Sequence, residues 1–132
     1  MSKTKSTPAG RIEIERIDHV TVDVTDLKKA QGFYAGLFGM SEIPRPESFT
    51  FAGCWYRIGK VDLHLVVKPQ PDPIVARHFC VWVKDVHAAA KLVAAAGFGV
   101  KWDDFKIPGI DRFFTADPDG NRLEVQGAEA KK

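Results

Sequence analysis

Three of the four histidines in this chain lie, with one glutamate, in stretches that read as strands. The interval from His19 to His64 is 45 residues, and the interval from His78 to Glu124 is 46. Imidazole and carboxylate ligands that leave vacant positions form a set that borderline divalent metals accept. These four residues therefore predict one divalent ion per site, with iron, manganese, nickel, cobalt and zinc as the candidates.

Side-chain alternation places all four candidates on the face of their strands opposite an apolar stripe. The stripe consists of Val20, Val22 and Val24, then Leu63, Leu65 and Val67, then Phe79, Val81 and Val83, and finally Leu123 and Val125. A lone strand histidine is more often a surface or core residue, but this joint placement favours a metal site. For Glu124 alone, the alternative is an edge-strand carboxylate paired with Arg122 or another base.

A metal held in this way supports several reactions. It can polarise a carbonyl, stabilise an enediolate, activate water or, as ferrous ion, bind a catecholate and dioxygen. The ligand set alone does not choose among these reactions.

Six further residues are candidates for lining a substrate pocket: Thr21, Trp55, Arg57, Cys80, Trp102 and Arg112. The basic and aromatic members suit an anionic or aromatic substrate, although aromatic residues in strands more often belong to the core or its rim. Cys80 is read as a small pocket-lining residue, with a soft ligand or a reactive thiol as the alternatives. His87 follows the helix-capping Asp85, so we expect a solvated side chain and exclude it from the metal set.

The elements that must position these residues occur twice in the same order. In the first half, periodicity predicts a strand over 17–24, a helix capped by Asp26 and ended by Gly39, and strands over 41–45, 49–58 and 61–68. In the second half it predicts a strand over 77–83, a helix between Asp85 and Gly97, and strands near 100–105, 112–116 and 122–126. Residues 117–120 (DPDG) form the last predicted turn.

The two halves also share a register, because Asp26 and Asp85 each lie seven residues after the first histidine of their half. This repeat predicts an α+β fold of two βαβββ modules. We place a flexible tail at 1–15, one domain at 16–127 and a C-terminal tail at 128–132. Within the domain, the modules span about 16–68 and 76–127, and a proline-containing linker spans 69–75.

Composition restricts the class of partner. At 132 residues, with 45% hydrophobic and 27% charged residues, the chain fits one globular domain. The net charge of +2 favours no polyanion, so we expect a small-molecule substrate and no nucleic acid. Residues 1–10 lack an apolar signal segment and no later stretch reads as a membrane span, so we expect a cytoplasmic protein. Cys54 and Cys80 are expected to be free thiols.

Five stretches resemble the vicinal oxygen chelate superfamily, which contains glyoxalases, bleomycin-resistance proteins and extradiol dioxygenases. They are IDHVTVDVTDL, FYAGLFGM, VDLHLVV, HFCVWVKDV and DPDGNRLEV, and the resemblance covers about residues 16–127. It implies that two βαβββ modules form an open, cupped mixed sheet around a metal ion. The resemblance also implies that His19, His64, His78 and Glu124 are the ligands.

The same resemblance implies a homodimer. In many such proteins the first module of one chain lies beside the second module of its partner. The ion would then take His19 and His64 from one chain and His78 and Glu124 from the other, which the linker permits. A site within one chain remains the alternative.

Within the superfamily we expect a metal-dependent lyase or isomerase of glyoxalase type that acts on a small oxygen-bearing substrate. Glu124 is predicted to act in catalysis, and His64 to be either the fourth ligand or an acid–base group. Glyoxalase I usually has a carboxylate at the position of His64, whereas fosfomycin-resistance enzymes use a set that matches His19, His78 and Glu124. The alternatives are an extradiol-type ring-cleaving dioxygenase and a non-catalytic drug-binding protein of bleomycin-resistance type.

Overall fold

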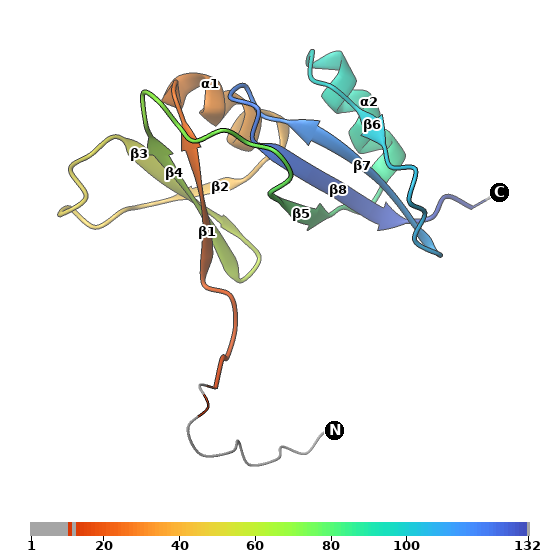
Figure 1. Ribbon diagram of the computed structural model, residues 1–132, viewed down its shortest axis with the longest axis horizontal. Helices are drawn as coiled ribbons and strands as arrows, with labels where there is room; N and C mark the ends of the chain where they lie inside the picture. The colour runs from red at the N-terminus through yellow and green to blue at the C-terminus, as the bar shows by residue number, and fades with distance from the viewer. Residues whose placement is uncertain (1–10, 12, 132) are drawn as a thin grey trace.

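The computed structural model describes residues 11 and 13–131, and its elements divide into two βαβββ units (Figure 1). Most of the N-terminal tail predicted at 1–15 and the last residue of the C-terminal tail lie outside the described residues. Within the described part, no helix combines the length and apolar character of a membrane span.

The first unit is a four-stranded mixed sheet with its helix between the first two strands. Its elements are β1 (His19–Val24), α1 (Leu27–Gln31), a π-helix (Gly32–Leu37), β2 (Ser41–Ile43), β3 (Gly53–Ile58) and β4 (Val61–Val67). The strand order is β1-β4-β3-β2, with β1 parallel to β4 and the other pairs antiparallel. Because β1 and β4 are parallel neighbours, residues from the two ends of the unit lie side by side.

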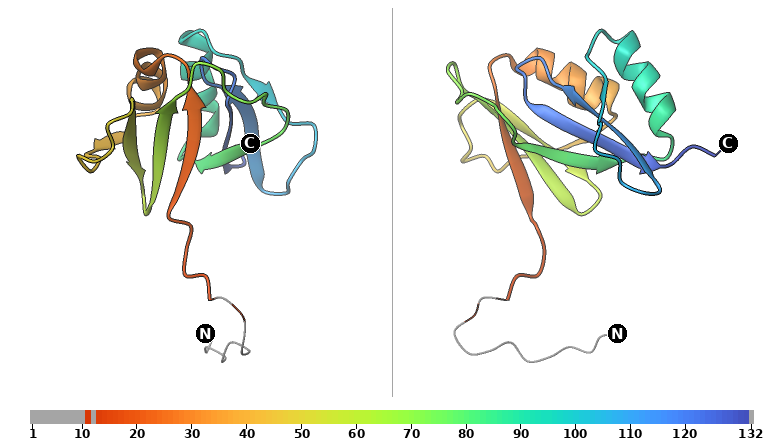
Figure 2. Two further views of the ribbon diagram at one scale, coloured as in Figure 1. Left: turned by 60° about the vertical axis from the view of Figure 1, so that its left-hand side comes forward. Right: turned by 45° about the vertical axis from the view of Figure 1, so that its right-hand side comes forward.

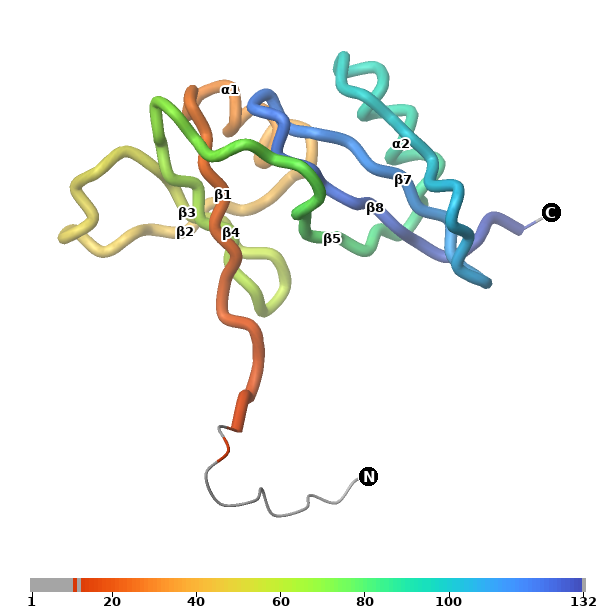
Figure 3. Tube along the Cα trace, in the orientation of Figure 1, coloured from red at the N-terminus to blue at the C-terminus, as the bar shows by residue number. Residues whose placement is uncertain are grey.

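The second unit repeats this plan. Its elements are β5 (His78–Trp82), α2 (Val86–Ala95), β6 (Lys101–Trp102), β7 (Ile110–Ala116) and β8 (Arg122–Ala128). The strand order is β5-β8-β7-β6, and β5 is parallel to β8. The predicted internal repeat and the α+β class are therefore confirmed. Figure 3 shows the connection after β4 crossing from the first sheet to the second.

Both helices begin at the predicted aspartates. The side chain of Asp26 accepts a 3.1 Å hydrogen bond from the backbone N–H of Lys29, and Asp85 accepts one of 3.0 Å from Ala88. Each such cap satisfies an otherwise unpaired N–H and stabilises its helix by about 1 kcal/mol. The caps fix where each helix starts, directly after the strand that carries the first histidine of its unit.

The first helix differs from the single α-helix that the sequence predicted. After Gln31 it continues as a π-helix, in which the N–H of Phe38 donates to the carbonyl of Phe33 at 3.1 Å. The wider turn allows the consecutive Phe33 and Tyr34 to be buried together, with 1% and 0% exposure. Burial of two adjacent large rings explains the departure from α-helical geometry.

Several predicted strands are shorter than expected, and two of them differ by four residues each. The strand predicted over 49–58 begins at Gly53, because residues 47–52 form turns in which Phe49 packs edge-on against Trp55. The strand predicted over 100–105 covers only Lys101–Trp102. It stops there because the Asp103 side chain accepts a hydrogen bond from the N–H of Phe105 at 2.8 Å and turns the chain.

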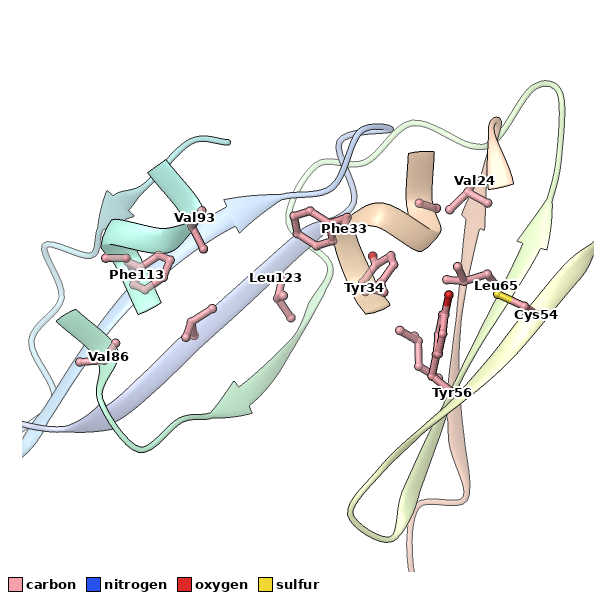
Figure 4. Packing of buried hydrophobic residues seen from close by; sticks show 14 residues of the cluster. Val24, Phe33, Tyr34, Cys54, Tyr56, Leu65, Val86, Val93, Phe113 and Leu123 are labelled. Atoms are coloured by element: carbon pink, nitrogen blue, oxygen red, sulfur yellow. The ribbon is translucent and has the colours of Figure 1, made fainter. Parts of the chain in front are cut away.

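The core lies between the sheets and the helices, which occupy the same side of the molecule (Figure 2). Its fully buried members include Leu63 and Leu65 from β4, and Leu123 and Val125 from β8. The predicted apolar stripe therefore faces the helices, and we call the opposite side of each sheet its open face. Phe33 lies between the core residues of the two units and contacts Phe98 edge-on at 4.8 Å (Figure 4).

A polar cluster with a buried centre, the interunit clasp, also joins the units. It consists of Asp23, Thr25 and Tyr34 from the first unit and Asp117, Asp119 and Asn121 from the β7–β8 turn. Tyr34 donates to Asp117 at 3.0 Å, and the Asn121 amide donates to the carbonyl of Asp23 at 2.7 Å. Burial, together with the neighbouring Asp117 carboxylate, raises the pKa of Tyr34 well above its ordinary value. The tyrosine therefore remains a hydrogen-bond donor at all ordinary pH values.

Candidate metal and substrate site

The first pair of predicted ligands lies on the open face of the first sheet. His19 on β1 and His64 on β4 stack with 4.1 Å between ring centroids and 15° between planes. Trp55, the neighbour of His64 on β3, stacks on the same imidazole at 3.8 Å and 2°. The imidazole of His64 is thus held between two flat rings, and stacking leaves its nitrogens without a hydrogen bond to either ring.

Hydrogen bonding leaves this pair with nitrogens available to a metal. Nδ1 of His19 lies 2.9 Å from a carboxylate oxygen of Asp18, which only accepts, so Nδ1 donates and Nε2 keeps its lone pair. Nε2 of His64 is buried without a hydrogen-bond partner among the described residues. Its separation of 3.9 Å from Asp62 is too long for a hydrogen bond.

The charge state of His64 follows from its surroundings. Burial lowers the pKa of His64, and the neighbouring His19 lowers it further. The neutral imidazole is the form that binds metals. The unpaired Nε2 of His64 is therefore available to a metal ion.

The second pair lies on the open face of the second sheet. Nε2 of His78 on β5 is 3.1 Å from Oε1 of Glu124 on β8. Nδ1 of His78 lies 2.9 Å from the carbonyl of Ala76 and must donate to it. In a neutral ring Nε2 then presents a lone pair to a carboxylate oxygen, so the contact requires either an imidazolium or a cation between the two groups. This donor set fits a divalent ion.

Arg112 fixes the orientation of Glu124. Its Nη1 donates to Oε2 of Glu124 at 3.0 Å, and its Nη2 lies 3.0 Å from Asp103 and donates to the carbonyl of Phe105 at 2.6 Å. Arg112 was predicted to line the substrate pocket, but these contacts leave its guanidinium little capacity for a ligand. Its geometry is that of a positioning residue for Glu124. The alternative for Glu124 is corrected in part: β8 is an interior strand and not an edge, and the paired base is Arg112 and not Arg122.

Four other predicted pocket residues share the open faces. Thr21 is opposite His64 in the register, and Cys80 is opposite Glu124. Trp55 stacks on His64 as described, and Arg57 on β3 is hydrogen-bonded to Asp62. Burial, with the Glu124 carboxylate nearby, raises the pKa of Cys80 to about 11, so its thiol is protonated at neutral pH.

Trp102 is the predicted pocket residue that the structure places elsewhere. It stacks on His87 at 4.7 Å and contacts the core residue Phe113 edge-on at 5.3 Å. In the register Trp102 is opposite Phe113, so its side chain lies on the helix side of the sheet. His87, which was excluded from the metal set, is about half exposed and lies 2.7 Å from Asp111.

The four predicted ligands form two pairs instead of one cluster within the chain. Over the described residues, no three side chains of His, Cys, Asp and Glu are grouped closely enough to hold a metal ion. The pairs lie on separate sheets (Figure 1). Residues of the edge strands β1 and β5 border a cleft of about 300 Å³. A site that uses all four ligands is therefore incomplete in one chain.

The comparisons with known proteins assign the family. The model of the Glyoxalase/Bleomycin resistance protein/Dioxygenase superfamily matches residues 16–125. The chain belongs to this superfamily. A solved structure of a glyoxalase family protein from Bacillus anthracis superposes with a TM-score of 0.81 at 31% identity, covering 90% of this chain and 99% of that one.

Two curated members of the superfamily are similar in sequence. The chain is 24% identical to "Glyoxylase I 4" of Arabidopsis thaliana, over 86% of its own length and 71% of the relative's. It is 26% identical to "Glutathione transferase FosA" of Serratia marcescens, over 85% and 80% of the two lengths. These names belong to two different reactions, so membership of the superfamily does not by itself select one.

Sequence reasoning left two neighbours of His78 out of the candidate site. One is the second arginine of the second sheet, Arg122, which the register places beside His78. Its spacing of two residues from Glu124 was the available signal, because it assigns both to the open face. The other is the backbone carbonyl of Ala76, which orients His78 and which no side-chain pattern reveals.

Proposed function

We propose that this chain is a metal-dependent enzyme of glyoxalase type, a lyase or isomerase acting on a small substrate that chelates a divalent ion through oxygen. The observation that carries the proposal is the 3.1 Å contact between Nε2 of His78 and Glu124, made while Nδ1 is committed to Ala76. The buried, unpaired Nε2 of His64 supports it from the other sheet. His19, His64, His78 and Glu124 are the proposed ligands.

A homodimer is proposed to complete the site. Each chain holds one half-site on each open face, so two chains together supply the donors for two four-ligand sites. The open face of the second sheet also carries a large apolar group that needs cover, because Trp82 is 60% exposed on the face of His78. Phe105, in the loop before β7, is 82% exposed. We propose that the first sheet of one chain faces the second sheet of its partner.

The bound ion would supply Lewis-acid polarisation of a chelated substrate oxygen. The protein's own groups would bind and orient the substrate around it. Arg112 orients the Glu124 carboxylate, and Trp55 holds the ring of His64 flat against His19. Neutral His64 has a nitrogen that can accept a proton, so it serves either as the fourth ligand or as the base.

Metal analysis with matched variants tests this proposal. Protein purified without added metal is dialysed against manganese, zinc, nickel, cobalt or ferrous ion and analysed for metal content. We expect binding to be lost in His78→Ala and retained in His87→Ala, since His87 lies outside the site. A site at His78 would be contradicted if both variants lost metal binding. It would also be contradicted if neither the wild type nor the variants bound metal.

Catalysis is tested separately on the metal-loaded protein. α-Oxoaldehyde adducts of thiols test isomerase chemistry, catechols test ring cleavage, and an epoxide with glutathione tests the transfer named for the Serratia relative. Glu124→Gln is expected to abolish whichever activity the wild type shows. Ligand binding that survives Glu124→Gln in a protein with no turnover would favour the non-catalytic binding class instead.

A further inference from the structure

Arg122 has no role in the proposed metal site. We infer that Arg122 binds an oxyanion of the substrate, a carboxylate or a phosphonate-like group, next to the oxygen that chelates the metal. This inference rests on the proposed function for the metal and adds the substrate class that the site would accept.

Arg122 is built into the same local structure as the metal ligand His78. The two residues are opposite one another in the β5–β8 register. The carbonyl of Ala76 accepts from both, at 2.6 Å from Nη1 of Arg122 and 2.9 Å from Nδ1 of His78. The ring of Phe114 also contacts both, with the guanidinium 4.4 Å above it and the imidazole edge-on at 5.0 Å. The position of Arg122 is therefore tied to that of the ligand.

The charge of Arg122 is unneutralised, in contrast to that of Arg112. Arg112 contacts two carboxylates, those of Glu124 and Asp103. Across residues 13–131, no carboxylate lies within ion-pair distance of Arg122. Among the described residues, its one hydrogen bond goes to the neutral carbonyl of Ala76 and uses one of five N–H donors. The remaining donors form a planar fork of the kind that binds carboxylate or phosphate in a bidentate manner.

Space for a ligand lies directly beside this guanidinium. Arg122, His78 and Arg77 line the cleft of about 300 Å³ between β1 and β5, together with Thr21 and with Asp23, whose carboxylate lies 3.8 Å from the ammonium of Lys68. Arg77 donates only to backbone carbonyls, at Pro73 and Asp72, so a second positive charge borders the same cleft. A substrate whose chelating oxygen reaches the ligand His78 would place an adjacent anionic group within reach of Arg122.

Three small ligands with the same hydroxymethyl chelating end test the inference. Glycolate carries a planar carboxylate, hydroxymethylphosphonate a tetrahedral oxyanion, and hydroxyacetone no charge. Dissociation constants are measured by calorimetry on metal-loaded wild type, Arg122→Gln and Arg45→Gln. Arg45 is the matched control, because it also lies over a phenylalanine ring and donates to a backbone carbonyl, both at Phe51, but belongs to the loop after β2.

We expect Arg122→Gln to weaken at least one of the two anions by about 10- to 100-fold, the usual effect of a lost charge-assisted hydrogen bond, with hydroxyacetone unchanged. Which anion loses more distinguishes a carboxylate from a tetrahedral oxyanion. Arg122→Lys is expected to recover part of the loss, and Arg45→Gln to bind all three ligands as the wild type does. Equal weakening of all three ligands, or no weakening, would overturn the inference.

Metal binding is measured first on the same samples. A failure of the metal site can then be distinguished from a failure of the oxyanion site. Normal metal content with no anion selectivity in Arg122→Gln contradicts the oxyanion site and leaves the metal site standing. If no sample binds metal, the proposed function fails, and the metal-free protein is titrated with hydroxymethylphosphonate. Binding lost only in Arg122→Gln would then support the oxyanion site, and any other pattern would overturn it.

Discussion

The hydroxyl of Tyr34 donates a 3.0 Å hydrogen bond to the carboxylate of Asp117, 83 residues further along the chain. Both groups are buried, and the bond joins the helix of the first unit to the last turn of the second. Asp117 also accepts from Asn121, whose amide donates to the backbone of β1. The interunit clasp therefore fixes how the two sheets sit relative to one another, and so where each half-site points.

Removing the tyrosine hydroxyl is predicted to destabilise the protein. Tyr34→Phe leaves the buried Asp117 carboxylate with one donor fewer, which costs about 1–3 kcal/mol in the free energy of unfolding. Chemical denaturation at neutral pH measures this change. Tyr56→Phe is the matched control, because the Tyr56 hydroxyl is equally buried but has no hydrogen-bond partner in the described structure. A loss in Tyr56→Phe as large as that in Tyr34→Phe would contradict the assignment.

The loss of folding stability at acidic pH is predicted to depend on Asp111. The ammonium of Lys106, first, and then His87 hold the pKa of Asp111 well below its ordinary value. A carboxylate with a lowered folded-state pKa stabilises the fold above its unfolded pKa of about 3.9, and this contribution is lost as pH falls toward the folded value. Wild type is therefore expected to lose stability below about pH 4 more steeply than Asp111→Asn.

Urea unfolding between acidic and neutral pH measures the two slopes. Asp111→Asn is expected to be less stable than wild type at neutral pH and closer to it in acid. Asp104→Asn, at an exposed position of the neighbouring loop, serves as the control and is expected to follow the wild-type curve. Parallel curves for wild type and Asp111→Asn would rule out this role for Asp111.

Arg112 is predicted to act on metal affinity through Glu124. Arg112→Gln removes the donor that orients the ligand carboxylate, and loss of such a supporting group typically weakens metal binding by about 10- to 100-fold. Equilibrium dialysis with manganese measures the effect, and Arg112→Lys is expected to restore part of it. Arg57→Gln is the control on the other sheet, where Asp62, not a proposed ligand, is the partner. Unchanged manganese affinity in Arg112→Gln would show that Glu124 does not depend on it.

Much of the fold was predictable because its signals are local. The caps at Asp26 and Asp85, the alternating strands and the repeat each follow from short stretches of sequence, and the structure has all of them. The π-helix was not predictable from periodicity, because burial of both Phe33 and Tyr34 depends on what the second unit places against them.

The candidate site was predictable only in part, for a similar reason. Alternation places His19, His64, His78 and Glu124 on the open faces, as the register shows. Which arginine is occupied and which is free depends on long-range contacts: Arg112 meets Asp103 and Glu124, whereas Arg122 meets a backbone carbonyl. Alternation likewise could not assign Trp102, because β6 is only two residues long and its face is set by pairing with β7.

The central claim is that two chains share each metal site, and a heterodimer of complementary variants tests it most directly. One chain carries His19→Ala and His64→Ala, the other carries His78→Ala and Glu124→Gln, and each has its own affinity tag. Neither variant alone is expected to bind metal. The heterodimer isolated through both tags contains one intact site if sites are shared, so the account predicts about half the wild-type metal content per dimer. A heterodimer without metal, beside a wild type that binds it, would contradict the account.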